Sequence, residues 1–251
     1  MKKEKWPQKG EISFKNFSVK YRPDTDIVLK NLNLTIKPGE KVGVCGRTGS
    51  GKSTMCLCLF RILEAEEGQI FIDGVDISTI GLDLLRNSIT IIPQDPCLME
   101  GTLKENIDPF NKSKNSEIIK ILKDIGFEYI EEDDKILDKN IEQNGSNLSV
   151  GQKQLICIAR ALLRKSKIVI MDEATSTLDL KTQSIMLKAL DKYFKDSTVL
   201  SIAHRIESVM NFDRIMVFDE GELKEFDKPS QLIKKKNSLF FKLYYEENQA
   251  K

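Results

Sequence analysis

The sequence of 251 residues lacks long apolar runs, an excess of charge of either sign and, except at one position, histidine. No stretch approaches the roughly 20 apolar residues of a membrane-spanning helix, and the Met-Lys-Lys start is not followed by the apolar core of a signal peptide. With 39 basic and 38 acidic residues, the chain has no net field that would favour nucleic acid or a membrane surface. We therefore expect a soluble globular chain that does not bind nucleic acid.

Cysteine is present, but it forms none of the patterns that indicate a metal site or a disulfide framework. The five cysteines are scattered among mostly apolar residues, at positions 45, 56, 58, 97 and 157. An odd number of scattered cysteines is typical of reduced thiols in the cytosol. We therefore expect free thiols.

The chain does contain one highly informative motif, a glycine-rich loop that follows the short apolar strand expected at 41–45. Residues 46–54 fit the pattern G-x-x-x-x-G-K-[ST], in which glycines let successive backbone N–H groups form a nest for phosphate oxygens. Lys52 can place its charge against the β- and γ-phosphates, and the Ser53 hydroxyl can ligate Mg²⁺. A helix predicted from about 52 to 62 directs its positive end at the same anion. The residues expected to bind a nucleoside triphosphate are Gly46, Arg47, Thr48, Gly49, Ser50, Gly51, Lys52, Ser53 and Thr54.

A second motif is a continuous apolar strand, 168–171, that ends in two carboxylates. A parallel strand covered on both faces has this composition, and ligands bind at its carboxyl end. Asp172 is therefore placed to hold Mg²⁺, and Glu173 can polarise a water for attack on the γ-phosphorus. The alternative, in which Asp172 caps a turn and Glu173 is merely solvated, would be preferred if the glycine-rich loop were absent.

The segment Ser149-Val150-Gly151-Gln152 leads into an apolar helix predicted at 150–164. A serine, a glycine and the N–H groups of a helix start can together bind an anion. The same residues can equally do no more than cap the helix. General physical chemistry leaves both interpretations open.

Strands and helices alternate along the rest of the chain, which predicts an α/β fold with a parallel sheet and right-handed crossovers. The first section, about 11–36, has the pattern of β-structure, and about 103–139 is helical and charged. The other predicted strands lie at 69–72, 90–92, 198–202 and 214–218, and a further helix lies at 180–194.

These motifs, in this order, resemble the nucleotide-binding domain of ATP-binding cassette (ABC) transporters, and the resemblance extends from about residue 10 to 246. It implies one domain, 1–251, with a P-loop NTPase (RecA-like) core built on a parallel sheet. About 10–40 would belong to an N-terminal antiparallel β-subdomain and about 95–165 to an α-helical signature subdomain. The remainder would be mainly ATPase core.

The resemblance also assigns roles that the residues alone would not. Tyr21 matches the aromatic residue that stacks on adenine, and Gln94 matches the glutamine that contacts Mg²⁺ and couples to the transmembrane part. Residues 176–179 match the loop that meets its counterpart across a dimer. His204, the single histidine, matches the switch residue that contacts the γ-phosphate. Ser149, Val150, Gly151 and Gln152 match the signature motif, which touches ATP held by the opposing domain.

Finer features resemble the second nucleotide-binding domain of the C subfamily, which contains the multidrug-resistance-associated proteins. They are 10–12, 21–23, 91–96, 105–110 and the Val150 variant of the signature. The first domain of such proteins usually lacks the catalytic glutamate, so Glu173 favours the second. The usual Phe-Ser-Gly after Asp-Pro is replaced here by residues 98–101, Leu-Met-Glu-Gly, a stretch that would neighbour the surface that couples to the partner.

The function that the resemblance implies is hydrolysis of ATP, with Mg²⁺, to power export of organic anions or drug conjugates. The partners would be a non-identical first nucleotide-binding domain and transmembrane domains, at the cytoplasmic face of a membrane. A regulatory nucleotide sensor, as in channel-associated sulfonylurea receptors, is the alternative, and Glu173 with His204 favours turnover. The long coiled-coil insertion of DNA-repair ATPases and the paired cassettes of translation-linked relatives are both absent.

Overall fold

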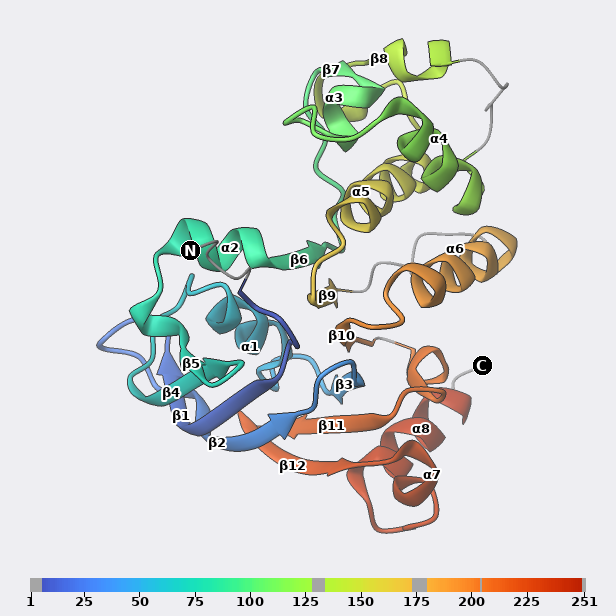
Figure 1. The fold of residues 1–251 in the computed structure, drawn as a ribbon. Coiled ribbons are helices and arrows are strands. Elements are labelled where there is room, and N and C mark those ends of the chain that lie inside the picture. Colours follow the sequence, from blue (N-terminus) through green and yellow to red (C-terminus); the bar gives the residue numbers. More distant parts are fainter. Residues whose placement is uncertain (1–5, 128–133, 173–179, 204, 250–251) are drawn as a thin grey trace. The chain divides into compact units, whose positions relative to one another are not determined.

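The computed structural model describes residues 6–127, 134–172, 180–203 and 205–249 (Figure 1). The chain divides into two compact units. Unit 1 is formed by the described parts of residues 1–90, 167–172 and 196–251, and unit 2 by those of 91–166 and 173–195.

The first sheet of unit 1 has four strands in the order β2-β1-β4-β5, and its paired strands are antiparallel. This sheet confirms the β-structure expected in the first section of the chain. Alternation along β2 buries Leu32, Leu34 and Ile36 while the residues between them are exposed. The bounds are β1 Ile12–Lys20, β2 Ile27–Ile36, β4 Glu67–Ile72 and β5 Val75–Asp76.

The second sheet has the strand order β12-β11-β3-β10-β9-β6. Its strands β11, β3, β10 and β9 are parallel to one another, and β12 is antiparallel to β11. The parallel strands are almost continuously buried, as expected for a sheet covered on both faces. This confirms the predicted α/β class. The bounds are β3 Lys41–Gly46, β6 Ile89–Ile92, β9 Ile168–Asp172, β10 Thr198–Ile202, β11 Arg214–Asp219 and β12 Glu222–Asp227.

Helix α1 (Lys52–Leu59) begins at the predicted residue but ends three residues before the predicted limit at 62. Arg61 adopts a left-handed backbone conformation, with φ of 48°. The N–H of Arg61 donates to the Cys58 carbonyl and that of Ile62 to the Leu57 carbonyl, the pair of bonds that closes a Schellman motif. Because glycine is the usual residue at this position, an arginine there gave no sequence signal for the helix end.

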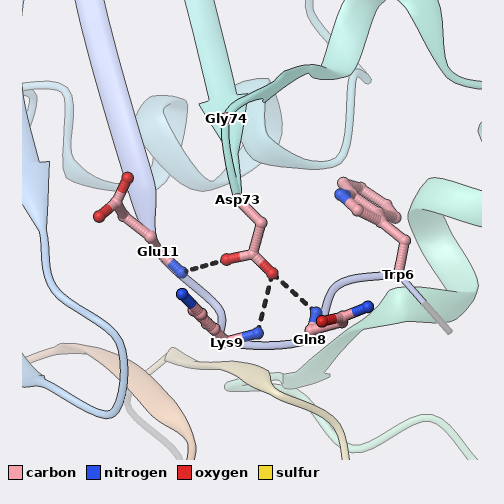
Figure 2. Close-up of a pocket in the computed structure, with 6 residues that line it drawn as sticks. All are labelled: Trp6, Gln8, Lys9, Glu11, Asp73 and Gly74. Carbon is pink, nitrogen blue, oxygen red and sulfur yellow. Dashed lines mark hydrogen bonds between the residues drawn. The ribbon is translucent and has the colours of Figure 1, made fainter. Parts of the chain in front are cut away.

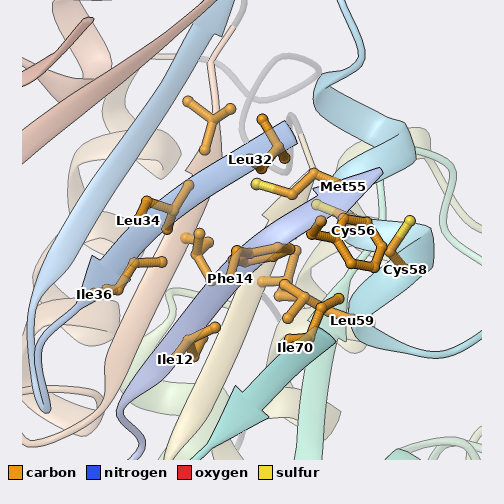
Figure 3. Packing of buried hydrophobic residues seen from close by; sticks show 14 of the residues in the cluster. Ile12, Phe14, Leu32, Leu34, Ile36, Met55, Cys56, Cys58, Leu59 and Ile70 are labelled. Carbon is orange, nitrogen blue, oxygen red and sulfur yellow. The ribbon is translucent and has the colours of Figure 1, made fainter. Parts of the chain in front are cut away.

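Helix α1 packs its apolar side chains against the antiparallel sheet and forms the main core of unit 1 (Figure 3). Met55 and Leu59 are fully buried there, together with Phe14 of β1. Both Cys56 and Cys58 are buried although they point to different sides of the helix. Opposite faces of α1 are therefore both buried in the protein interior. This packing fixes the position of the helix and of the loop that precedes it.

A second apolar cluster of unit 1 lies under its C-terminal helices. Phe240 and Leu232 are buried against strand residues such as Ile215 and Val217. The remaining helices of unit 1 are η1 Ile77–Thr79, α2 Leu82–Ser88, η4 Ile206–Val209, α7 Pro229–Leu232 and α8 Leu239–Gln249.

Unit 2 is mainly helical and is organised around α5 (Val150–Arg164), whose bounds are those predicted from the sequence. Arg160 of α5 donates through Nε to the Asn106 carbonyl at 2.7 Å. The helical pattern expected over 103–139 is interrupted, because α3 ends where Asp108 precedes a proline and turns to accept the N–H of Ser113. The bounds are β7 Gly101–Thr102, α3 Leu103–Ile107, α4 Asn115–Asp124, η2 Asp134–Asp138, β8 Asn140–Ile141, η3 Gln143–Gly145 and α6 Leu180–Tyr193.

Within the described ranges, every helix is too short or too polar to cross a lipid bilayer. The cysteines are all free, as expected. Four of them are buried, and Cys97 is exposed.

Thiol reactivity should therefore differ strongly between cysteines. Burial raises the pKa of Cys45 and of Cys58 to about 12, from an ordinary value of 9.0, which cuts the reactive thiolate roughly a thousandfold. We expect iodoacetamide at pH 8 to modify Cys97 first, as measured by mass spectrometry of the folded chain. Cys97→Ser should remove the fast phase. Equally fast labelling of Cys45 in the folded chain would contradict the burial.

Candidate nucleotide-binding site

The loop between β3 and α1 has the backbone geometry that a phosphate nest requires. Gly46, Gly49 and Gly51 all have positive φ, at 147°, 80° and 102°. A Cβ at Gly46 would lie 2.3 Å from the Phe218 carbonyl oxygen, and one at Gly51 would lie 2.5 Å from Leu29 Cδ2. These two glycines are therefore needed for close approach as well as for conformation.

Two polar side chains of the loop fit an anionic ligand. Lys52 donates through Nζ to the carbonyls of Gly46 and Arg47 at 2.8 and 2.9 Å, so its ammonium group lies across the loop. Ser50 Oγ is buried and has no hydrogen-bond partner among the described residues. With the N-terminal N–H groups of α1, these groups provide the positive charge and donors that a phosphate needs. The residues present therefore fit the phosphates of a nucleotide.

A glycine outside the motif, Gly221 in the turn between β11 and β12, helps to hold the loop. Its N–H donates to the Ser50 carbonyl at 3.2 Å, and its carbonyl accepts the N–H of Lys30 at 2.9 Å. With φ of 80°, a Cβ here would lie 2.1 Å from the Val28 carbonyl oxygen. The sequence does not distinguish this residue, because a glycine between two strand patterns indicates no more than a turn.

Tyr21 follows the last residue of β1 and lies against the start of α1. Its hydroxyl is 3.0 Å from Thr54 Oγ1, a hydrogen-bond distance. The side chain remains about half exposed, at 51%, whereas Thr54 is only 5% exposed. The structure thus brings Tyr21 and the phosphate loop together, although Tyr21 and Thr54 are 33 positions apart in the sequence.

Asp172 lies at the same edge of the sheet as the phosphate loop. It pairs with Ile202 of β10, and Ile202 pairs with Val44 of β3, shortly before Gly46. Its charge is also close enough to α1 to add to the rise in the pKa of Cys56 that burial causes. The carboxyl ends of parallel strands are where ligands bind in such folds.

The other site residues expected on these loops, Glu173 and His204, lie outside the described residues, as does the segment 176–179. Across the residues that are described, no group of three or more histidine, cysteine or acidic side chains could hold a metal. This does not argue against Mg²⁺, because that ion is usually held by one or two protein oxygens together with substrate phosphates and water.

Unit 2 carries the remaining predicted residues. Gln94 is exposed in the bend after β6. Ser149 caps α5, since its Oγ accepts the Gln152 N–H at 3.2 Å while Gln152 Oε1 accepts the Ser149 N–H at 3.0 Å. The structure therefore shows a helix cap, which both interpretations of this segment allow. Ser149 and Val150 are both exposed, so the cap leaves this helix end accessible.

The cavity drawn in Figure 2 contains an anion nest of a different kind. The Asp73 carboxylate accepts four backbone N–H groups, those of residues 8–11, at 2.7–2.9 Å. Trp6 closes one side through a hydrogen bond from Nε1 to the Ile72 carbonyl. The Asp73 carboxylate thus already satisfies these donors and anchors the N-terminal segment. The cavity is therefore not a candidate for binding the nucleotide.

Comparisons with known proteins agree with this geometry. The family model described as ABC transporter matches residues 29–176. Bile pigment transporter 1 of Saccharomyces cerevisiae is 50% identical over 258 residues, which cover 96% of this chain and 16% of that protein. ATP-binding cassette sub-family C member 3 of Rattus norvegicus is 50% identical over 231 residues, covering 92% and 15%. Metal resistance protein YCF1 of Saccharomyces cerevisiae is 47% identical over 243 residues, covering 96% and 16%.

A solved structure shares the fold. It is a bacterial Atm1-family ABC exporter with ATP bound, at a TM-score of 0.89 and 30% identity, covering 96% of this chain and 42% of the other. The chain spans about a sixth of the length of the curated relatives named above. The chain therefore belongs to the ABC transporter family and is a nucleotide-binding domain of the C-subfamily type.

Proposed function

We propose that this chain binds and hydrolyses ATP as the second nucleotide-binding domain of a C-subfamily exporter. The observation that carries the proposal is the phosphate loop, in which positive-φ glycines, the Lys52 ammonium and the buried Ser50 hydroxyl converge at the N-terminus of α1. Such a loop holds the phosphates by backbone N–H groups and a point charge. The presence of Glu173 supports the assignment to the second domain.

Each residue then has a role in phosphoryl transfer to water. Lys52 and the loop N–H groups bind the phosphates, and Tyr21 receives the adenine. Ser53, Asp172 and Gln94 would hold Mg²⁺, and the ion would neutralise charge on the phosphate oxygens. Glu173 accepts a proton from the attacking water, and His204 contacts the γ-phosphate.

The site is complete only with a second domain. Ser149, Val150, Gly151 and Gln152 would contact the nucleotide held by the partner, and the exposure of the capped end of α5 supports this role. The natural partner would be a non-identical first nucleotide-binding domain, with transmembrane domains that export organic anions or drug conjugates. The greater length of the relatives supports such an assembly, which would place this chain at the cytoplasmic face of a membrane.

Because each site needs two domains, the ATPase rate per chain should rise with protein concentration. The purified chain should be slow and mainly monomeric when dilute, since dimer formation limits turnover. Measuring phosphate release over a range of concentrations tests the proposal. A full rate that is independent of concentration would mean that one chain contains the whole site.

Substitution of Ser149 tests the shared site without damaging the helix. Ser149→Asp keeps a good N-cap but places a negative charge where the partner's phosphates would lie, so the rate at high concentration should fall at least ~10-fold. ATP affinity at the chain's own phosphate loop should not change. Ser149→Asn, a neutral cap of nearly the same size as aspartate, is the matched control and should retain more activity. Equal ATPase rates for Ser149→Asp and Ser149→Asn would show that Ser149 does not contact the partner's nucleotide.

A further inference from the structure

We propose that Tyr21 and Thr54 act as a pair, in which the hydrogen bond between their hydroxyls holds the Tyr21 ring ready for the nucleotide base. The inference rests on the proposed function and extends it. Stacking alone would make Tyr21 an aromatic surface that phenylalanine could replace. The structure assigns a separate role to the phenolic oxygen and makes Thr54 a positioning residue for the base.

The first observation is the exposure of the Tyr21 loop. Lys20, just before it, forms the last strand pair, with Ile27. Residues 21–27 are all exposed. The backbone is held at its ends, and within the loop Arg22 and Thr25 form a turn through hydrogen bonds of 2.9–3.1 Å. Packing in the protein interior therefore does not fix the aromatic side chain.

The second observation is that Thr54 is a rigid anchor. It is 5% exposed and lies in the first turn of α1, beside Lys52 and Ser53. The next residue, Met55, is fully buried and donates its N–H to the Gly51 carbonyl at 3.0 Å. The hydrogen bond between Tyr21 and Thr54 thus ties an exposed ring to the part of the helix that follows the phosphate loop directly.

The chemistry of a hydroxyl lets Thr54 keep this bond while a ligand binds. A hydroxyl has one donor and two acceptor positions. Thr54 Oγ1 can therefore accept a hydrogen bond from the Tyr21 hydroxyl while its own O–H donates to another oxygen, such as one of a phosphate. With its oxygen tied to α1, the ring loses less freedom when a base stacks on its exposed face, which favours binding.

A double-mutant cycle with two ligands tests the pair. The proteins are the parent chain, Tyr21→Phe, Thr54→Val and the double variant, with ATP and inorganic tripolyphosphate titrated by calorimetry. Tyr21→Phe should lower ATP affinity about fivefold in the parent, the order of the cost of ordering one free side chain on binding, and should have no effect in Thr54→Val. Its affinity for tripolyphosphate, which has no base, should equal that of the parent.

Further variants separate this role from folding and from simple stacking. Thr54→Ser keeps the hydroxyl and should retain more ATP affinity than Thr54→Val. Tyr21→Ala should weaken ATP binding more than Tyr21→Phe because it also removes the ring. Thermal melts check that Thr54→Val is folded. If it is not, the affinities of Tyr21→Phe and the parent for ATP and tripolyphosphate still test whether the phenolic oxygen contributes to base binding.

Two results would overturn the pair: parental ATP affinity in Tyr21→Phe, or the same loss in both Thr54 backgrounds. Failure of the proposed function looks different, because the parent chain would then bind neither ATP nor tripolyphosphate.

Discussion

Lys52→Ala should abolish measurable ATP binding to this chain. The Lys52 ammonium lies across the phosphate loop, bonded to the carbonyls of Gly46 and Arg47. A methyl group can neither neutralise phosphate charge nor satisfy those carbonyls. Truncation of one partner of a close charge pair costs about 2–5 kcal/mol, or roughly 30-fold to several thousandfold in affinity. Calorimetry with ATP and Mg²⁺ measures this loss directly.

Two controls make the result specific. Lys37→Ala removes an exposed lysine that precedes the N-terminal end of β3, whereas the phosphate loop follows the C-terminal end of that strand. This variant should leave ATP affinity unchanged. Lys52→Met keeps the length of the side chain without its charge, so it should lose binding as Lys52→Ala does. Melting curves should show that both Lys52 variants are folded. Near-parental affinity in the folded Lys52→Met variant would rule out a phosphate contact by Lys52.

Glu173→Gln should leave binding of ATP and Mg²⁺ intact while the chemical step nearly stops. The amide has the shape of the carboxylate but cannot accept a proton from the attacking water. The loss of a general base costs a factor of about 10²–10⁴ in rate. The measurement is phosphate release at saturating ATP and at a protein concentration high enough for dimers.

Asp172→Asn is the companion variant, because it alters the neighbouring carboxylate at the end of β9. It should weaken the dependence of binding on Mg²⁺, a defect that Glu173→Gln should not share. Unchanged turnover in Glu173→Gln would move the base elsewhere, with His204 as the next candidate. A parent chain that binds ATP but does not turn it over at any concentration would favour the regulatory sensor.

The features that sequence determined are those written in short, continuous segments. Residues 46–54 specify their loop because glycines and a lysine at fixed spacing have few other structural solutions. The unbroken apolar run 168–171 predicts a buried parallel strand, and the structure has β9 there. Helix α5 occupies its predicted bounds, since apolar residues recur at helical spacing after a capping serine.

Only the tertiary structure decided the contacts between remote segments. Gly221 holds the phosphate loop from the opposite end of the chain, and nothing in its local sequence distinguishes it from an ordinary turn glycine. The hydrogen bond of Tyr21 to Thr54 arises because β1 and α1 are packed through one core, which fixes both backbones. Local patterns encode backbone preference and the face that is buried. The side chains that meet across a sheet depend on the packing of the whole unit, because close packing leaves each buried group a single set of neighbours.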